Sequence, residues 1–496
     1  MQIVVIGAGL GGLSAAMHLR GAGHDVVVVE RESIPGGRAG EIRRDGYRFD
    51  TGPTVMTMPG LLRAPFEACG QDMDSYVTLR PVDPMYRAVY ADGSELRVWH
   101  GRERMIEEIR TVCGPKEADA FVRFCRWLTD LYTLEMPNFI DRNLDSPLDL
   151  AWPPGPGLRL VRTGGFRRLG KVVESYFDDH RLQRLFSFQA MYAGMAPMEA
   201  LAVYCVITYM DSVEGVYFPD GGMHAIASGM AAAATAAGVE FRYDSLVSSI
   251  LRAPGSTGRV IGVELAGGER IDADCVVANP DLPLVYRELL DGVSAPRATR
   301  TGRYSPSCVV WHAGVRGELP DGVAHHNIHF GHQWHGAFRS LIDDGELMAD
   351  PSILVTVHSL DSPGDAPIGA HTLYVLEPVP NLDGTVDWAS ERNAVQERLT
   401  ALVERCGYPV DVEVSEFVDP RDWQAQGMER GTPFALAHTF RQTGPFRPGN
   451  IDRRVPGLVL VGSGTVPGVG VPMVLVSGRL AAERVAQLAG GRGARS

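Results

Sequence analysis

The chain has 496 residues, with 60 acidic and 47 basic side chains and a formal net charge of −13. This length allows two or three domains with a large core, and the acidic balance argues against the broad basic surface that nucleic-acid binding requires. The seven cysteines are scattered and never spaced as CxxC, so they indicate neither a disulfide framework nor a zinc site and are typical of a reducing cytoplasm.

The start of the chain has the pattern of a strand, a glycine-rich turn, a helix and a second strand. Apolar runs at residues 3–6 and 26–29 predict the strands, and the turn contains Gly7, Gly9 and Gly12. In such a βαβ unit the first glycine permits a tight bend, the second lets the backbone approach a pyrophosphate, and the third lets helix and strand pack closely. The helix N-terminus then faces the anion. The pattern predicts a dinucleotide site, and the alternative is a glycine-rich turn without a ligand.

The stretch after the second predicted strand extends this site. Glu30 ends the strand, where its carboxylate can accept hydrogen bonds from ribose hydroxyls. Arg38 follows a glycine pair and is a cation that can neutralise pyrophosphate charge. Simple nicotinamide-binding domains do not need this extension. The residues of this region that we place in the cofactor site are Arg31, Gly37, Arg38, Gly52, Pro53 and Thr54.

A second glycine-rich turn lies near the other end of the chain, in VPGLVLVGSGTVPGVGVPMVLVSG. An apolar strand at residues 458–461 enters the turn, and Pro472 stands where a helix would begin, a position at which its missing N–H costs nothing. The residues that we select for contact with the cofactor are Gly464, Gly470, Val471 and Met473. The alternative is an ordinary strand, turn and helix that close the sheet.

The two glycine clusters together resemble the flavoprotein superfamily that contains the amine oxidases and the carotenoid desaturases. The resemblance implies FAD as the cofactor, with the loop around Arg38 lying along it and the C-terminal helix pointing at the flavin pyrimidine. The dipole of that helix would stabilise the negative charge of reduced flavin. The resemblance also implies that Val247 lies on the strand that meets the adenine.

Two distant segments that build one cofactor site indicate a discontinuous domain. We expect an α/β fold: a Rossmann-like FAD-binding domain with an inserted α+β substrate domain and a helical lid. The FAD-binding domain is expected to comprise residues 1–78, 215–290 and 440–490. Residues 79–214 are mostly helical in pattern and would form the lid facing the membrane, whereas strand-like runs in 291–439 would form a sheet under the substrate. Residues 491–496 are expected to be disordered.

Further blocks in the same order make the resemblance more specific. They are GYRFDTGPTVMTMP, FSFQAMYAGMAP, GVYFPDGGMHA, HHNIHFG and TFRQTGPFRPGNID. With them, the chain resembles the bacterial phytoene desaturase family nearly end to end. The resemblance implies an FAD-dependent oxidoreductase that lengthens the conjugation of phytoene toward neurosporene or lycopene. Hydride transfer from an allylic carbon to flavin N5 and loss of the neighbouring proton would form each double bond.

Other functions stay open at this point. The substrate could be a C30 or a partly desaturated carotenoid, or the flavin could support cis–trans isomerisation without net oxidation. An amine oxidase would share both glycine-rich segments of the FAD-binding domain. However, the aromatic residue that usually encloses the amine near the C-terminal helix is absent from PGVGVPMVLVSG. A non-catalytic carrier of isoprenoid lipids on the same fold would not need an intact flavin site.

The middle of the chain supplies soft and aromatic side chains that suit a flexible hydrocarbon, although core packing explains them equally well. They are Met191, Met195, Met198, Met210, Tyr192, Tyr204 and Tyr209. The sequence identifies no catalytic residue. Asp141 and Arg142, in NFIDRNLDSP, are weak candidates for proton handling or for polarity at the tunnel mouth, and a surface ion pair is the alternative.

Several histidines crowd the stretch HHNIHFGHQWH. Histidine clusters can bind metal. Strand alternation, however, would place His325 and His329 on one face, and His326 with Ile328 and Phe330 on the other. We therefore expect a strand of the substrate domain and no metal site.

The chain contains no run of about 18 uncharged apolar residues, so no spanning helix is predicted. No charged residue precedes Arg20, which argues against an export signal. We expect a cytoplasmic protein that contacts the membrane surface peripherally. Apolar insertion would drive this contact, because a net negative chain gains little from anionic headgroups. The expected partners are the long polyene substrate and an electron acceptor, either oxygen or a quinone.

Overall fold

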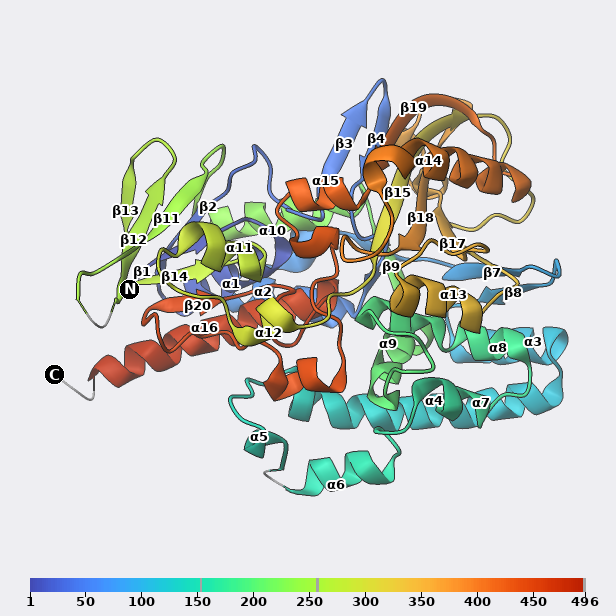
Figure 1. The fold of residues 1–496 in the computed structure, drawn as a ribbon, viewed down its shortest axis with the longest axis horizontal. Helices are drawn as coiled ribbons and strands as arrows, with labels where there is room; N and C mark the ends of the chain where they lie inside the picture. Colours follow the sequence, from blue (N-terminus) through green and yellow to red (C-terminus); the bar gives the residue numbers. More distant parts are fainter. Residues whose placement is uncertain (152–153, 256–257, 494–496) are drawn as a thin grey trace.

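The computed structural model describes residues 1–151, 154–255 and 258–493. A parallel five-stranded sheet forms the centre of one half of the molecule (Figure 1). In sheet order its strands are β10 (Glu240–Arg242), β2 (Asp25–Val29), β1 (Gln2–Ile6), β14 (Cys275–Ala278) and β20 (Leu458–Leu460). All neighbouring strands in this sheet pair in parallel. The strands predicted at both ends of the chain are confirmed, and they belong to one sheet.

Both faces of this sheet are buried, as is usual for parallel strands. Ile3 and Val5 pack against helices on one face, whereas Val4 and Ile6 pack against a small antiparallel sheet on the other. The helices are α1 (Leu10–Gly21), α2 (Pro59–Ala68), α10 (His224–Ala236) and α16 (Val471–Gly493). The small sheet contains β11 (Val247–Arg252), β12 (Val260–Leu265) and β13 (Arg270–Asp272). The Ser14 hydroxyl on α1 donates to the Leu475 carbonyl on α16 at 2.8 Å, which joins the two ends of the chain.

A seven-stranded mixed sheet forms the other half. In sheet order its strands are β19 (Asp411–Val418), β15 (Ser307–Arg316), β18 (Ala370–Val379), β17 (Ile353–Thr356), β16 (His326–Phe330), β7 (Tyr86–Tyr90) and β8 (Glu95–Val98). Helix α14 (Trp388–Arg405) covers one face, where Val395 and Leu399 pack against Val309 and Trp311 of β15. The strand expected from HHNIHFG is present as β16, and the strand-like runs expected in residues 291–439 include β15 and β17.

The first part of the expected helical lid is not helical. Residues 79–98 form β6 (Leu79–Pro81), β7 and β8, and β7 pairs in parallel with β16. Tyr86, Ala88 and Tyr90 are buried in the same hydrophobic cluster as Ile328 and Phe330 of β16. Aromatic residues in a strand gain their stability from cross-strand neighbours, and here the neighbour is far away in the sequence. The prediction of helices for residues 79–98 was therefore wrong, because it rested on a local pattern. Strand β6 joins a further small sheet with β5 (Met56–Thr57) and β9 (Val216–Pro219).

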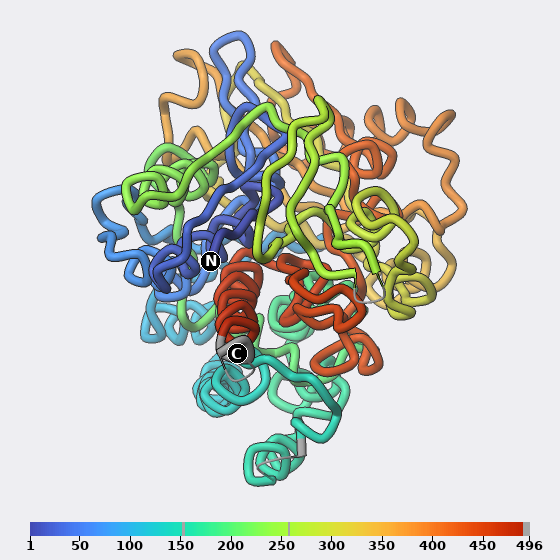
Figure 2. The backbone as a smooth tube through the Cα atoms, turned by 90° about the vertical axis from the view of Figure 1, so that its left-hand side faces the viewer, coloured from blue at the N-terminus to red at the C-terminus, as the bar shows by residue number. Residues whose placement is uncertain are grey.

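The helical part of the lid lies along the bottom and lower right of the molecule in Figure 1, and most of it lies below α16 in Figure 2. Its helices are α3 (Arg102–Val112), α4 (Pro115–Glu135), α5 (Leu148–Ala151), α6 (Pro154–Arg162), α7 (Leu169–Glu174), α8 (His180–Leu185) and α9 (Cys205–Tyr209). The remaining short helices are α11 (Leu282–Leu284), α12 (Arg297–Thr301), α13 (His335–Arg339) and α15 (Pro420–Ala425). Within the described ranges, no helix combines the length and the hydropathy needed to cross a bilayer.

Helix α16 extends further than the sequence suggested. It runs to Gly493, whereas disorder was expected from residue 491. Adding a residue to an existing helix gains a hydrogen bond without a new nucleation cost, which outweighs the low helix propensity of the glycines. Residues 494–496 of the expected tail lie outside the described residues.

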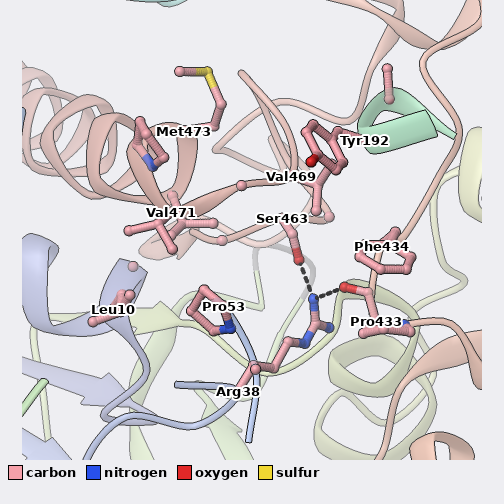
Figure 3. A pocket seen from close by; sticks show the side chains of 18 of the residues that line it. Leu10, Arg38, Pro53, Tyr192, Pro433, Phe434, Ser463, Val469, Val471 and Met473 are labelled. Carbon is pink, nitrogen blue, oxygen red and sulfur yellow. Dashed lines mark hydrogen bonds between the residues drawn. The ribbon is translucent and has the colours of Figure 1, made fainter. Parts of the chain in front are cut away.

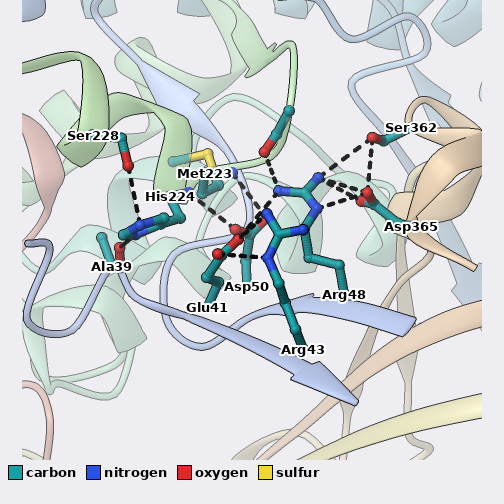
Figure 4. Close-up of polar contacts among 11 residues, drawn as sticks. Ala39, Glu41, Arg43, Arg48, Asp50, Met223, His224, Ser228, Ser362 and Asp365 are labelled. Atoms are coloured by element: carbon teal, nitrogen blue, oxygen red, sulfur yellow. Dashed lines mark hydrogen bonds and ion pairs between the residues drawn. The ribbon is translucent and has the colours of Figure 1, made fainter. Parts of the chain in front are cut away.

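A buried polar cluster fixes the loop between β2 and α2 (Figure 4). This loop carries the hairpin of β3 (Glu41–Arg44) and β4 (Tyr47–Asp50). The Asp50 carboxylate accepts hydrogen bonds from the backbone N–H groups of Met223 at 2.8 Å and His224 at 3.0 Å, at the start of α10. The Arg48 guanidinium donates to Asp365 at 2.8 Å. The cluster therefore ties this loop to both halves of the molecule.

Candidate active site

A cavity of about 1220 Å³ joins the two halves. One end is lined by the glycine turn after β1 and by the end of β2, and the other end by side chains of the lid and the seven-stranded sheet. Small-molecule sites usually have volumes of roughly 300–1,000 Å³. The cavity is therefore large enough for a dinucleotide and a second ligand beside it.

Backbone N–H groups hold Glu30 in place at the end of β2. Its Oε2 accepts from the N–H of Ala8 at 2.6 Å, and its Oε1 accepts from the N–H of Glu32 at 3.0 Å. The residue is only 6 % exposed and lines the cavity. A carboxylate accepts about four hydrogen bonds, so Glu30 retains capacity for the hydroxyls of a ribose.

The turn after β1 needs glycine for two different reasons. Gly9 precedes α1 without a side-chain cap, which leaves the first N–H groups of the helix available to an anion. A Cβ on Gly12 would lie 2.1 Å from the carbonyl oxygen of Gly7. Gly7 and Gly9 line the cavity, whereas Gly12 serves the close packing of α1 against β1.

Arg38 lies between the N-terminal and C-terminal turns (Figure 3). Its Nη1 donates to the carbonyl of Pro433 at 2.6 Å and to the hydroxyl of Ser463 at 2.8 Å, and its Nη2 is 3.7 Å from a carboxylate oxygen of Asp281. Burial lowers the pKa of the guanidinium, and the Asp281 carboxylate partly offsets this effect. Arginine remains protonated at neutral pH, and 32 % of this side chain is exposed. The cation is therefore accessible to an anion in the cavity.

The C-terminal turn brings a second helix N-terminus to the cavity. Helix α16 begins at Val471, with Pro472 in its first turn as predicted. In Figure 3, Val471 lies between Met473 above it and Leu10 and Pro53 below it, and the latter two come from the N-terminal part of the chain. The cofactor-site residues of the sequence prediction that line the cavity are Gly7, Gly9, Glu30, Arg31, Gly37, Arg38, Gly52, Pro53, Thr54, Val247, Gly464, Gly470, Val471 and Met473. An uncapped helix, a fixed acid and an accessible cation together fit the ribose and pyrophosphate of a dinucleotide.

The substrate end of the cavity is mainly apolar. Of the methionines and tyrosines selected from the sequence, those that line it are Met191, Tyr192, Tyr204 and Met210. Tyr209 instead stacks on Tyr132, with ring centroids 4.3 Å apart. Further lining side chains from the substrate half are Ile328, Phe330, Trp334, Phe338 and Phe434. Flexible thioethers and aromatic rings suit a long hydrocarbon.

The two weak catalytic candidates lie in different surroundings. Asp141 forms an ion pair with Arg479 of α16, with Nε 3.0 Å from Oδ1, outside the cavity lining. Arg142 lines the cavity. Asp141 therefore corresponds to the alternative interpretation, in which this residue forms an ion pair and has no catalytic role.

Two buried carboxyl groups line the substrate end and were missed by the sequence analysis. Glu135 is 4 % exposed, and burial raises its pKa well above the ordinary value. Asp211 is 7 % exposed, and burial raises its pKa to about 7, although hydrogen bonds from Ser212 and Gln189 oppose this rise. For Asp211 the sequence did contain a signal, since this acid is isolated within the apolar stretch ALAVYCVITYMDS. Buried acids are rare unless they are paired or functional.

The histidines of HHNIHFGHQWH are divided among separate partners. His326 lines the cavity, whereas His329 Nε2 lies 3.1 Å from the Tyr408 hydroxyl. His325 Nδ1 lies 2.6 Å from the Asp361 carboxylate. In residues 1–151, 154–255 and 258–493, no three potential metal ligands converge.

Comparisons with known proteins define the class of this site. Residues 10–486 match the model of the flavin containing amine oxidoreductase family. The fold is similar to that of an oxidoreductase from Methanosarcina mazei, with a TM-score of 0.63 and 18 % identity over 98 % of this chain and 100 % of that chain. The protein is an FAD-dependent oxidoreductase, and the predicted fold class and cofactor are confirmed.

Two relatives narrow this class further. The chain is 47 % identical to a phytoene dehydrogenase of Streptomyces griseus over 490 residues, which cover 98 % of this chain and 95 % of the relative. It is 35 % identical to a zeta-carotene-forming phytoene desaturase of Myxococcus xanthus, over 98 % of this chain and 93 % of the relative. The chain therefore belongs to the flavin containing amine oxidoreductase family and, within it, to the carotenoid desaturases.

Proposed function

We propose that the protein desaturates phytoene and forms more conjugated carotenoids such as neurosporene or lycopene. The observation that carries this proposal is the cavity that continues from the nucleotide turn into a wall of methionine and aromatic side chains. A hydrocarbon offers no heteroatom to bind, so shape and apolar contact must position it. The names of the two relatives support the same substrate.

The residues around the cavity suggest how the cofactor and substrate are held. FAD, when bound, accepts the hydride equivalent that leaves an allylic carbon. We assign Glu30 to the ribose, Arg38 to the pyrophosphate and Val247 to the adenine end. The turns before α1 and α16 would supply backbone contacts, and the apolar wall would exclude water and align the substrate. Oxygen or a quinone would reoxidise the enzyme.

We also infer that the cavity opens toward a lipid surface. The apolar side chains that we call the rim are Leu148, Leu158, Val161, Phe166 and Phe440, and their exposed fractions are 76, 51, 58, 47 and 53 %. Phe166 and Phe440 contact each other edge to face, with ring centroids 6.3 Å apart, and both line the cavity. Exposed apolar side chains at a cavity mouth provide area for insertion into a bilayer. The protein would thus take its substrate directly from the membrane, as a peripheral protein of the cytoplasm.

Product analysis tests the proposed reaction. Purified holoprotein is mixed with liposomes that contain phytoene, a C30 analogue or a partly desaturated carotenoid, and the extracted products are separated and their visible spectra recorded. We expect phytoene to be converted to products with longer conjugation. Isomers with unchanged conjugation would indicate a redox-neutral isomerase instead. Turnover of the C30 analogue alone would reassign the substrate.

A further inference from the structure

A polar network interrupts the apolar wall of the cavity at Asp211. Its carboxylate accepts from the Ser212 hydroxyl at 2.7 Å and from the Gln189 amide at 3.2 Å. The Ser212 hydroxyl also lies 2.9 Å from the hydroxyl of Tyr86. Gln189 is held in turn, because its amide donates to the Leu185 carbonyl at 3.1 Å. The network fixes the carboxylate at the cavity surface.

The surroundings of Asp211 leave it able to accept a proton. The titratable groups that face it are Tyr86, Tyr192 and, behind Tyr86, His326. Among the residues that the structure describes, no lysine or arginine forms an ion pair with this carboxylate, so no cation stabilises it permanently as an anion. The side chains of Ser212, Gln189 and Tyr86 donate to the carboxylate, which can accept about four hydrogen bonds and therefore retains some capacity.

We propose that Asp211 is a catalytic base that accepts the proton lost by the substrate in each desaturation. The inference rests on the proposed function. In the step, a hydride leaves one allylic carbon for FAD, and a C–H bond on the neighbouring carbon breaks. The electron pair of this C–H bond becomes the second bond of the new C=C, and the proton binds a carboxylate oxygen of Asp211. The substrate loses two electrons and two hydrogens in total.

Other titratable groups at the cavity are less suited to this step. Burial disfavours the ionised form of Glu135 and raises its pKa well above the ordinary value, which makes its carboxyl group a poorer proton acceptor. The Nδ1 of His326 already lies 2.9 Å from the Thr356 hydroxyl. A general base works best when its pKa lies near the working pH, and Asp211 meets this condition because burial raises its pKa to about 7.

Ser212 acts as a positioning residue. Its hydroxyl donates to the ionised carboxylate and therefore favours the charged form of Asp211. Removing this hydroxyl should raise the pKa of Asp211 without removing the base. The Ser212→Ala variant thus separates the chemistry of the carboxyl group from a purely structural role.

The decisive experiment compares holoenzymes with matched FAD content and melting temperature. Single-turnover rates with phytoene liposomes are measured as a function of pH for the wild type, Asp211→Asn, Ser212→Ala and, as the control, Asp130→Asn, because Asp130 is exposed on α4. We expect the wild-type rate to rise with pH up to a plateau above about pH 7. In Asp211→Asn the single-turnover rate should fall by roughly 100-fold or more, and the rate should no longer depend on pH. In Ser212→Ala the rise of the rate should move to higher pH, and the control Asp130→Asn should match the wild type.

A second readout is independent of turnover. Infrared difference spectra between acidic and alkaline pH should show a buried carboxyl group that titrates near neutral pH in the wild type and is missing in Asp211→Asn. An active wild type with an equally active Asp211→Asn, or an unchanged infrared signal in that variant, overturns the assignment. A wild type that leaves phytoene unchanged overturns the proposed function itself, so the two failures are distinguishable.

Discussion

The two ends of the cavity are built in different ways. At the nucleotide end, the lining comes mainly from backbone groups of two glycine turns. Glu30 accepts a hydrogen bond from Ala8 in the first turn, and Arg38 donates one to Ser463 in the second turn. At the substrate end, side chains from helices and strands far apart in the sequence form the wall. The nucleotide end therefore depends on close backbone packing at positions such as Gly12, whereas the substrate end depends on burial and on the ionisation states of its side chains.

The largest effect is expected when Gly12 is replaced by a residue that has a side chain. Gly12→Val places a Cβ 2.1 Å from the Gly7 carbonyl oxygen, so α1 must move away from β1. We expect purified protein that lacks FAD absorbance and that has lost about 1–3 kcal/mol or more of unfolding free energy. The control is Gly60→Ala, because a Cβ there meets no atom within 4 Å. Full FAD content in Gly12→Val would contradict the close packing.

The substrate half should be sensitive to acid. His312 is 1 % exposed, and burial lowers its pKa to about 4 from 6.5. Below pH 6.5 the unfolded chain binds a proton at this residue, whereas the folded chain does not until about pH 4. The free energy of unfolding should thus fall as the pH drops from 6.5 to 4, by about 3 kcal/mol from this group. His326 and His329, whose pKa values are lowered to about 3 and about 4, act in the same direction.

Denaturant titrations at pH 7 and pH 5 measure this loss. His312→Phe should lose less stability between the two pH values than the wild type does. The matched control is His335→Gln, since His335 is exposed, and it should behave like the wild type. Equal pH dependence in His312→Phe and the wild type would argue against a neutral, buried His312.

A smaller effect is expected from Arg38, because the backbone turns remain. Arg38→Met should weaken FAD binding by about 10- to 100-fold, since a hydrogen bond to a charged group contributes roughly 1.5–3 kcal/mol. Titration of apoprotein with FAD, followed by flavin fluorescence, gives the dissociation constant. Arg43→Met is the control, because Arg43 is exposed and pairs with Glu41. Unchanged affinity in Arg38→Met would remove Arg38 from the cofactor site.

The smallest effect concerns the rim. Leu158→Ser with Val161→Ser should lower partitioning onto liposomes by about tenfold, because less apolar area is available for insertion. Cosedimentation with vesicles measures the partitioning. Ile368→Ser is the control, since Ile368 is fully exposed and lies outside the rim. If the control weakens binding as much as the double variant does, the membrane contact lies elsewhere.

The same difference explains which parts of the site the sequence could predict. Glycine spacing, the acid at Glu30 and Pro472 are local signals, so both turns were predictable, and nearly all of the residues predicted for the cofactor site line the cavity. The pairing of β7 with β16 and the burial of Asp211 depend on contacts between distant segments. No local pattern contains such contacts, and for this reason the start of the lid was assigned to helices. The isolated acid in ALAVYCVITYMDS indicated burial but not the partners of Asp211, and it was missed.

The measurement that tests the central claim most directly is an anaerobic one. Purified protein with bound FAD is mixed with phytoene liposomes in the absence of oxygen and quinone, and the visible spectrum is followed. The account predicts bleaching of the flavin absorbance together with new polyene bands, whose positions report the double bonds added. A flavin that stays oxidised in the presence of phytoene would contradict the claim that this cavity desaturates phytoene.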